Sequence, residues 1–186
     1  TAEENYDAAI EALEEAKRLG ITSVQDITFE DALSTFTNLK DEGKLTCRIF
    51  TRWPISDYKS LVDKKIKIGY GDEYIKMGSL KGFADGSLGS STAWFFERYN
   101  QDTTTTGLPM DIITDGSMEK WALDADKNYL QLSVHAIGDR ANSYMLDLYD
   151  KISKQNPKWD RRFRIEHAQH VRFEDIKRFK ELGVIA

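Results

Sequence analysis

The stretch LKGFADGSLGSSTAW, residues 80–94, joins a short extended run to a turn rich in glycine and serine. Two later stretches have the same form: SVHAIGDRA begins at Ser133, and FRIEHAQ begins at Phe163. In each stretch, a brief run delivers one side chain that can serve as a metal ligand, just before a small or polar turn. These side chains are Lys81, His135 and His167. The lengths between the stretches suit successive strand–helix units, the plan on which metalloenzyme barrels are built.

Strands and helices are predicted to alternate along the whole chain. Apolar and β-branched runs predict strands at residues 21–26, 45–53, 79–84, 129–135, 163–167 and from 184 onward. Helical spacing of apolar residues predicts helices at residues 6–19, 29–40, 56–62, 116–127, 139–153 and 173–182. Between Asp85 and Gly107 regular signals are few, and a long loop is expected there. This order predicts an α/β fold with a parallel sheet and outer helices, either doubly wound or closed into a barrel.

The spacing of the predicted strand ends favours the barrel. No glycine-rich phosphate loop follows the first strand, and the glycines of GDEYIKMGSLKG, residues 71–82, are wrongly spaced for one. Nucleotide binding is therefore the weaker interpretation. A whole (β/α)8 barrel usually needs about 250 residues, whereas this chain has 186. We therefore expect a single domain, residues 1–186, that forms a partial TIM barrel of about six parallel strands with outer helices and lacks the first and last strands.

Composition sets limits on location and partners. The chain is 40% hydrophobic and 31% charged, with a net charge of −5, and positive residues are interspersed with negative ones. No basic stripe points to nucleic acid, and no apolar run resembles a membrane helix or a signal peptide. A small molecule is the expected partner, and the cytoplasm is the favoured location. Cys47 lies in the apolar run LTCRIF and is expected to be a buried core residue without redox chemistry.

The strand ends carry the candidate chemistry. In a parallel barrel, the residues at the C-terminal ends of the strands face the mouth, where ligands gather. His135 and His167 are predicted at neighbouring strand ends, as metal ligands or as structural histidines. Strand alternation places Lys81 on the same face as Phe83 and Asp85, so an inward-facing strand would bury its ammonium. The alternative is a surface lysine with its tip in water.

The three stretches resemble a known family. KGFADGSLGSSTAW is similar to the signature K-x-F-A-D-G-S-L-G-S-R-T-A of family 3 of the amidohydrolase superfamily, the branch of N-substituted formamide deformylase. HAIGDRA and RIEHAQ match the next two motifs of that family, and ITSVQD, GLPM and ELGVIA are similar to its connecting segments. The resemblance thus covers nearly the whole chain. Ser91 stands where the family commonly has arginine, a change expected to affect substrate contacts more than metal binding.

The resemblance implies a fold, a cofactor and a reaction. Family members are metal-dependent hydrolases on a distorted TIM barrel, in which a lysine carboxylated by CO2 and two histidines bind the metal. At the matching positions these ligands are Lys81, His135 and His167, and the metal is expected to be one or two divalent ions, with zinc the expected element. The full-length protein is then expected to hydrolyse a C–N bond, in an amide, a formamide or an N-acyl group, through metal-activated water.

Part of the family's constellation has no counterpart in this sequence. The family also uses a His-x-His pair on its first strand and an aspartate base on its eighth strand, and neither strand is recognised here. No catalytic base is therefore assigned. The segment alone is expected to be inactive and to hold metal weakly or not at all, with Lys81 uncarboxylated or poorly ordered.

Further polar residues near the three stretches have two interpretations each. Asp85 would either turn the chain or orient a metal ligand. Asp139 would cap a helix or support His135. His170 would reach substrate, or else be solvated or capping. Glu166 precedes His167 and is expected on the opposite face, paired with a basic neighbour, Arg164 or Arg140.

The aromatic residues of the long loop also allow two interpretations. The cluster would form the wall of a hydrophobic substrate pocket, or it would pack the loop against the barrel rim. Its members are Trp94, Phe95, Phe96 and Tyr99.

Two further expectations concern the chain as a whole. The alternative to an enzyme is a non-catalytic, metal-free α/β scaffold that binds a ligand or a protein partner through its strand ends. In either case, a sheet that lacks its first and last strands has two open edges, near Ile21–Gln25 and from Val184 onward. Self-association through these edges is expected.

Overall fold

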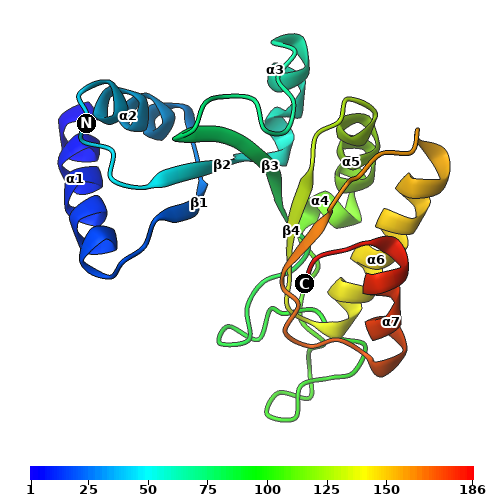
Figure 1. The fold of residues 1–186 in the computed structure, drawn as a ribbon. Coiled ribbons are helices and arrows are strands. Elements are labelled where there is room, and N and C mark those ends of the chain that lie inside the picture. Colours follow the sequence, from blue (N-terminus) through cyan, green and yellow to red (C-terminus); the bar gives the residue numbers. More distant parts are fainter. The chain divides into compact units, whose positions relative to one another are not determined.

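A computed structural model describes residues 1–186, except for the side chain of Glu30. The helices are α1 (Ala2–Arg18), α2 (Glu30–Asp41), α3 (Tyr58–Asp63), α4 (Asp111–Thr114), α5 (Ser117–Lys127), α6 (Asp139–Gln155) and α7 (Phe173–Leu182), with a 3-10 turn, η1, at Ile55–Asp57 (Figure 1). The strands are β1 (Ser23–Ile27), β2 (Arg48–Pro54), β3 (Ile75–Phe83), β4 (Leu132–Ala136) and β5 (Arg164–His167).

The strands form one sheet in chain order, β1-β2-β3-β4-β5. The pairs β1–β2, β3–β4 and β4–β5 are parallel. Within the described residues, the sixth predicted strand is reduced to a parallel bridge between Arg164 and Ile185. The predicted fold class, an α/β partial TIM barrel with outer helices, is confirmed.

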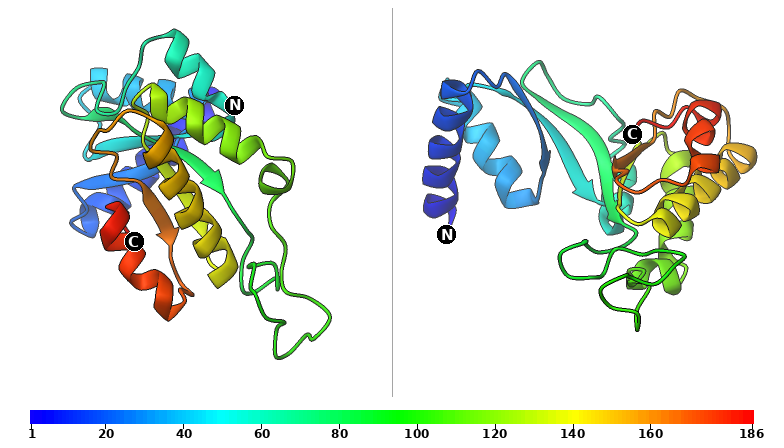
Figure 2. Two further views of the ribbon diagram at one scale, coloured as in Figure 1. Left: turned by 90° about the vertical axis from the view of Figure 1, so that its right-hand side faces the viewer. Right: turned by 90° about the horizontal axis from the view of Figure 1, so that it is seen from below.

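The chain divides into two compact units, Thr1–Ser79 and Leu80–Ala186, with the boundary inside β3. In the N-terminal unit, α1 and α2 pack together beside β1 and β2, as Figures 1 and 2 show. Their shared core consists of Leu13, Leu39, Leu45, Cys47 and Ile49. Cys47 is buried, as predicted. That residues 1–186 act as one domain remains a prediction.

Local signals explain where several helices begin and end. The hydroxyl of Thr1 accepts the N–H of Glu4, and the Glu4 carboxylate bonds back to the amino group of Thr1, so α1 starts with a capping box. At the other end of the chain, Gly183 has a φ of +65° and terminates α7. Glycine adopts this left-handed conformation at little energetic cost, because it has no Cβ.

The strands of the C-terminal unit have two chemically different faces. One face is apolar and fully buried, with α6 packed on β4; it presents Leu80, Leu132, Val134, Ala136 and Ile165. The opposite face is polar, and its members are Lys81, Ser133, His135, Arg164 and Glu166. Parallel pairing sets residues of one face side by side, so Lys81 lies opposite Ser133 and Phe83 opposite His135. Figure 2 shows the long loop 84–110 (green) at the C-terminal end of β3.

Some boundaries differ from those that the sequence predicts. β3 begins at Ile75 instead of residue 79, because the chain is already hydrogen-bonded at Tyr74, whose carbonyl accepts the N–H of Ile49 at 2.7 Å. β4 begins at Leu132 instead of residue 129, since Tyr129 has a φ of +61° and turns the chain. The short helix α4 was not expected. Among the described helices, none combines the length and the apolar character that crossing a bilayer requires.

A buried ion pair fixes the segment that leads into β5. The carboxylate of Asp126, 1% exposed, accepts hydrogen bonds from Asn156 (2.9 Å), Trp159 (2.8 Å) and Arg161 (2.7 Å). These bonds join the end of α5 to the residues that follow α6. Nearby, Asp160 and Arg162 form a second pair, but both of these side chains are about 70% exposed.

These two pairs provide a matched test of stability. We expect Asp126→Ala to lower the free energy of unfolding by about 3–5 kcal/mol, because it leaves Arg161 nearly buried without its partner. Asp160→Ala should cost less than about 1 kcal/mol, because solvent screens the exposed pair. Urea unfolding of both variants measures the difference. Equal losses would contradict this account of the Asp126 network.

Candidate metal centre

Lys81 occupies the polar face of β3 and is buried. The residue is 6% exposed, and its Nζ atom lies 4.4 Å from the centroid of the Phe83 ring. The ring of Phe83 in turn lies 5.4 Å from that of His135. The alternative of a surface lysine is therefore wrong, and β3 presents Lys81 toward the strand that carries His135.

His135 and His167 are neighbours at the ends of β4 and β5. Their ring centroids are 4.6 Å apart, and the ring planes meet at 71°. His167 ends β5 with a φ of +73°, and Ala168 follows with a φ of +41°. Because this backbone departs from extended geometry, simple strand alternation no longer decides where the His167 ring points.

Glu166, the residue before His167, lies on the polar face of β5. It pairs with Arg164 at 2.8 Å, one of the two partners expected from sequence. However, it also accepts a hydrogen bond from the Ser133 hydroxyl at 2.9 Å, and its register partner is His135. Glu166 therefore shares the polar face with Ser133 and His135. The expected pairing with a basic neighbour is thus confirmed, and His167 takes the next register position, opposite Ala136.

The environment of His167 favours its neutral form. Although His167 is an exposed residue, partial desolvation of its imidazole lowers its pKa from the ordinary value of 6.5, and His135 and Lys81 lower it further against the opposite effect of Glu166 and Asp85. A neutral imidazole is the form that binds a metal ion.

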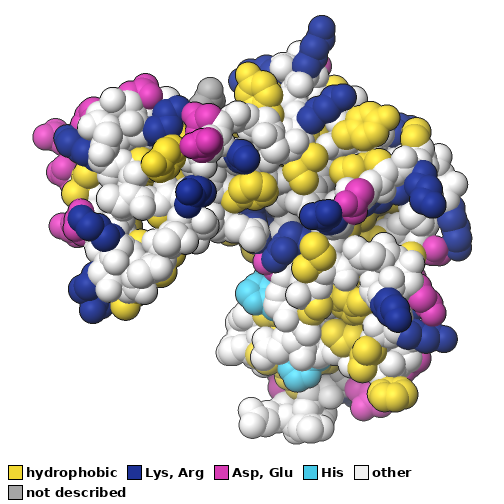
Figure 3. All heavy atoms as spheres, viewed as in Figure 1, with side chains coloured by type: hydrophobic (Ala, Val, Ile, Leu, Met, Phe, Trp, Pro, Cys, Tyr) yellow, Lys and Arg dark blue, Asp and Glu magenta, His cyan; other side chains and the backbone are white. Residues whose placement is uncertain are grey.

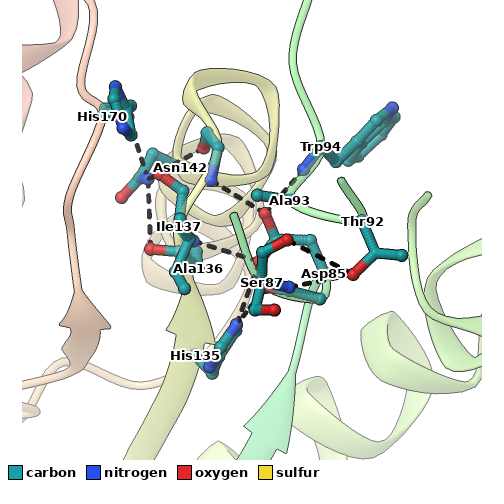
Figure 4. Close-up of polar contacts among 12 residues, drawn as sticks. Asp85, Ser87, Thr92, Ala93, Trp94, His135, Ala136, Ile137, Asn142 and His170 are labelled. Carbon is teal, nitrogen blue, oxygen red and sulfur yellow. Dashed lines mark hydrogen bonds and ion pairs between the residues drawn. The ribbon is translucent and has the colours of Figure 1, made fainter. Parts of the chain in front are cut away.

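Asp85 organises the loops around these side chains. Its carboxylate is 1% exposed and accepts three backbone N–H groups (Figure 4). The donors are Trp94 (2.8 Å), Ile137 (3.0 Å) and Gly138 (2.8 Å). Asp85 thus ties the end of β3 to the long loop and to the turn after β4.

The same carboxylate helps to orient His135. Asp85 Oδ1 lies 3.3 Å from His135 Nε2, and the carbonyl of Gly86 lies 2.8 Å from the same nitrogen. With a proton on Nε2, the ring donates to these oxygens and leaves Nδ1 as the free acceptor. Both interpretations of Asp85 therefore hold in geometry: it shapes the turn and it contacts a candidate ligand.

Asn142 is a residue that the motifs did not single out. It is fully buried in α6, and its amide group donates to the carbonyls of Ala136 (3.2 Å), Gly138 (2.9 Å) and His170 (3.1 Å). These bonds join the turns after β4 and β5 (Figure 4). The sequence did offer a signal for this role, because Asn142 lies one turn into a predicted helix. A polar residue on the buried face of a helix needs hydrogen-bond partners.

Gly138 is fixed by close packing in the same place. A Cβ built on this residue would lie 2.0 Å from the Trp94 carbonyl oxygen, which no side chain can accommodate without moving the backbone. The loop after β3 and the start of α6 therefore touch backbone to backbone.

Asp139 has another partner than expected, whereas His170 is exposed and its two interpretations both stay predictions. The residue before α6 is Gly138, with no side-chain cap, and Asp139 Oδ1 instead accepts the N–H of Phe96 at 3.0 Å. The cap interpretation is therefore wrong, and Asp139 anchors the long loop. The N–H of His170 donates to the Ile137 carbonyl at 3.0 Å, and the His170 ring meets the Phe95 ring at 5.2 Å.

The aromatic cluster of the long loop divides into two pairs. Trp94 and Phe96 lie against guanidinium groups: Arg140 is 4.6 Å from the Trp94 ring centroid, and Arg172 is 4.5 Å from that of Phe96. Phe95 and Tyr99 instead line a pocket of about 420 Å³ together with His170. Two members of the cluster thus pack the long loop and two line a pocket, and that this pocket takes substrate stays a prediction.

The side chains fit a metal that prefers nitrogen and oxygen ligands. Two adjacent imidazoles, one oriented through Nε2 and one favoured in its neutral form, supply nitrogen donors. Among the described residues, no group of three or more His, Cys, Asp or Glu side chains gathers around a common point. The role of Lys81 as a third ligand stays a prediction from the family resemblance. Histidine side chains are visible on the surface of the C-terminal unit in Figure 3 (cyan).

A partial TIM barrel with candidate metal ligands at successive strand ends defines a class, the barrel proteins whose sites lie at the C-terminal ends of the strands. Within that class, the chain belongs to the amidohydrolase family, whose model matches residues 1–186.

Individual relatives agree with this assignment. The chain is 32% identical over 198 residues to "Protein LONG AFTER FAR-RED 3" of Arabidopsis thaliana, covering 100% of this chain and 34% of that protein. It is 36% identical over 111 residues to "Putative amidohydrolase YtcJ" of Bacillus subtilis (strain 168), covering 60% of this chain and 20% of that protein. The chain thus spans about a third, or less, of the length of these curated relatives.

Solved structures share the fold. An uncharacterised metal-dependent hydrolase from Pyrococcus horikoshii OT3 superposes with a TM-score of 0.85 at 28% identity, over 99% of this chain and 36% of that one. A second, from Pyrococcus furiosus, superposes with a TM-score of 0.85 at 29% identity, over 99% and 37%.

The arrangement of charges predicts how His167 titrates. We expect its NMR titration midpoint to lie below 6.5, since burial and positive neighbours disfavour the imidazolium. Lys81→Met should move the midpoint back toward 6.5, because it removes one of those charges. By linkage, the unfolded chain takes up this proton first as pH falls, so the contribution of His167 to stability is present above pH 6.5 and declines below it. A midpoint at or above 6.5 would contradict the geometry.

Proposed function

We propose that the protein is a metal-dependent hydrolase that cleaves a C–N bond in an amide, a formamide or an N-acyl group. One observation carries the proposal: the His135 and His167 rings lie 4.6 Å apart at neighbouring strand ends, and the adjacent strand β3 carries the buried Lys81. The family assignment supports it. The names of the Bacillus and Pyrococcus relatives, an amidohydrolase and metal-dependent hydrolases, are consistent with it.

Lys81, His135 and His167 would hold the metal, which we propose to be zinc. A bound divalent ion would polarise a substrate carbonyl and lower the pKa of a water molecule. Only the neutral form of the Lys81 amine can add to CO2 to give an anionic carbamate, so this reaction requires the ammonium to lose a proton first. The carbamate would offer oxygen ligands in place of an ammonium that cannot bind a cation.

The surrounding residues prepare the ligands for that role. The Gly86 carbonyl and the Asp85 carboxylate both face His135 Nε2, which fixes the tautomer and the plane of the ring. The polar face of β4 and β5 also carries Ser133 and Glu166, hydrogen-bonded to each other at 2.9 Å. This hydrogen bond holds the Glu166 carboxylate close to the strand ends.

The family branch is part of the proposal. The run from Lys81 to Ala93 matches the signature of the N-substituted formamide deformylase branch except where Ser91 replaces arginine. Ser91 adopts a φ of +55° and donates its N–H to the Leu88 carbonyl at 3.0 Å. It therefore belongs to the turn of the loop that follows β3.

Metal analysis and hydrolysis assays of the full-length protein test the proposal. We expect near-stoichiometric metal in the natural protein and a loss of metal in Lys81→Ala, with the hydrolysis rate falling by about a hundredfold or more. Lys76→Ala is the matched control, because Lys76 lies on the same strand but is exposed. That variant should keep both metal and activity.

The scaffold alternative predicts the opposite result. A protein that folds normally, contains no metal after purification with added zinc and bicarbonate, and hydrolyses none of a panel of formamides and N-acyl amines would favour a non-catalytic ligand-binding role.

A further inference from the structure

A pocket of about 420 Å³ lies within the C-terminal unit, lined by residues of the segments that follow the strands of the candidate metal centre. Its volume is within the range of pockets that take small organic ligands. Three of its residues, Leu88, Asp139 and His170, come from the segments that follow β3, β4 and β5. These are the same strands that carry the candidate metal ligands, so the pocket and the centre share one set of loops.

Hydrogen bonds connect the pocket to the centre over short stretches of chain. The Gly86 carbonyl, two residues before Leu88, contacts His135 Nε2 at 2.8 Å. On the opposite side, the N–H of His170 donates to the carbonyl of Ile137, two residues after His135, at 3.0 Å. Two hydrogen bonds and two short stretches of chain therefore connect the lining of the pocket to His135.

The pocket has aromatic walls. The Phe95 ring meets the Tyr99 ring at 5.2 Å with an interplanar angle of 89°, and it meets the His170 ring at 5.2 Å and 76°. Such edge-to-face arrangements suit the insertion of a further ring, because ring edges are positive and ring faces negative.

Polar groups next to these rings are already engaged. Asp139 accepts the N–H of Phe96 at 3.0 Å, and the Tyr99 hydroxyl donates to the Ala93 carbonyl at 2.8 Å. The remaining polar residues of the lining, Arg98 and Asn100 among them, are exposed. The pocket therefore offers an aromatic interior with a polar rim, which suits a flat apolar group better than a charged one.

We propose that this pocket receives an aromatic ring on the acyl side of the substrate, so that the protein prefers arylacyl amides over acetyl or formyl amides. The proposal rests on the proposed function and makes Phe95 the residue that sets the preference. Phe95 contacts the ring of the substrate, while the scissile bond lies toward His135 and His167.

Two substrates that share a leaving amine and differ only in a phenylacetyl or acetyl group provide the test. In the full-length protein, Phe95→Ala should lower kcat/KM for the phenylacetyl amide by about tenfold and leave that for the acetyl amide within about twofold. Phe96→Ala is the matched control: Phe96 is the next residue of the loop, stacks on Arg172 at 4.5 Å and is not part of the pocket lining. It should change neither value, and circular dichroism should show that both variants fold.

A binding measurement separates this inference from the proposed function. Ligand-observed NMR with phenylacetate should show binding that Phe95→Ala weakens and Phe96→Ala does not. If neither amide is hydrolysed but this pattern of binding appears, the aromatic pocket stands and the hydrolase proposal falls. If both amides are hydrolysed with a ratio that Phe95→Ala leaves unchanged, or if phenylacetate binds equally to all three proteins or to none, the pocket assignment is overturned.

Discussion

The carboxylate of Asp85 is the contact on which the geometry of the C-terminal unit depends. An ionised carboxylate removed from water is stable only when hydrogen-bond donors replace the water. Here the donors are backbone N–H groups of Trp94, Ile137 and Gly138, which lie far from Asp85 in sequence. Satisfying one side chain thus fixes the start of the long loop and the turn after β4 at the same time.

Several neighbouring contacts extend that constraint. Gly138 allows the Trp94 carbonyl to approach the turn, and Asn142 then joins the same turn to the segment after β5. The loops that follow three successive strands therefore behave as one hydrogen-bonded layer. The positions of His135, Phe95 and His170 are consequences of that layer more than of their own packing.

The sequence predicted the order of strands and helices well, because period-2 and period-3.6 patterns arise from burial on one face. It also identified the strand ends at which Lys81, His135 and His167 lie. It did not predict the three bonds of Asp85 or the role of Asn142, since a side chain that bonds to distant backbone leaves no periodic trace. Nor could alternation predict the direction of the His167 ring, because the backbone at this last residue of β5 is no longer extended.

The left-handed backbone at His167 and Ala168 carries an evolutionary consequence. Such conformations destabilise a non-glycine residue by about 1 kcal/mol or more, and they destabilise glycine only slightly. Two successive residues with φ of +73° and +41° therefore form a point at which selection for stability alone would introduce glycine. A glycine at position 168 would relax the turn, but it would also loosen the hold on the His167 ring. A strained pair at this strand end is what one expects where the orientation of a side chain matters more than the stability of the chain.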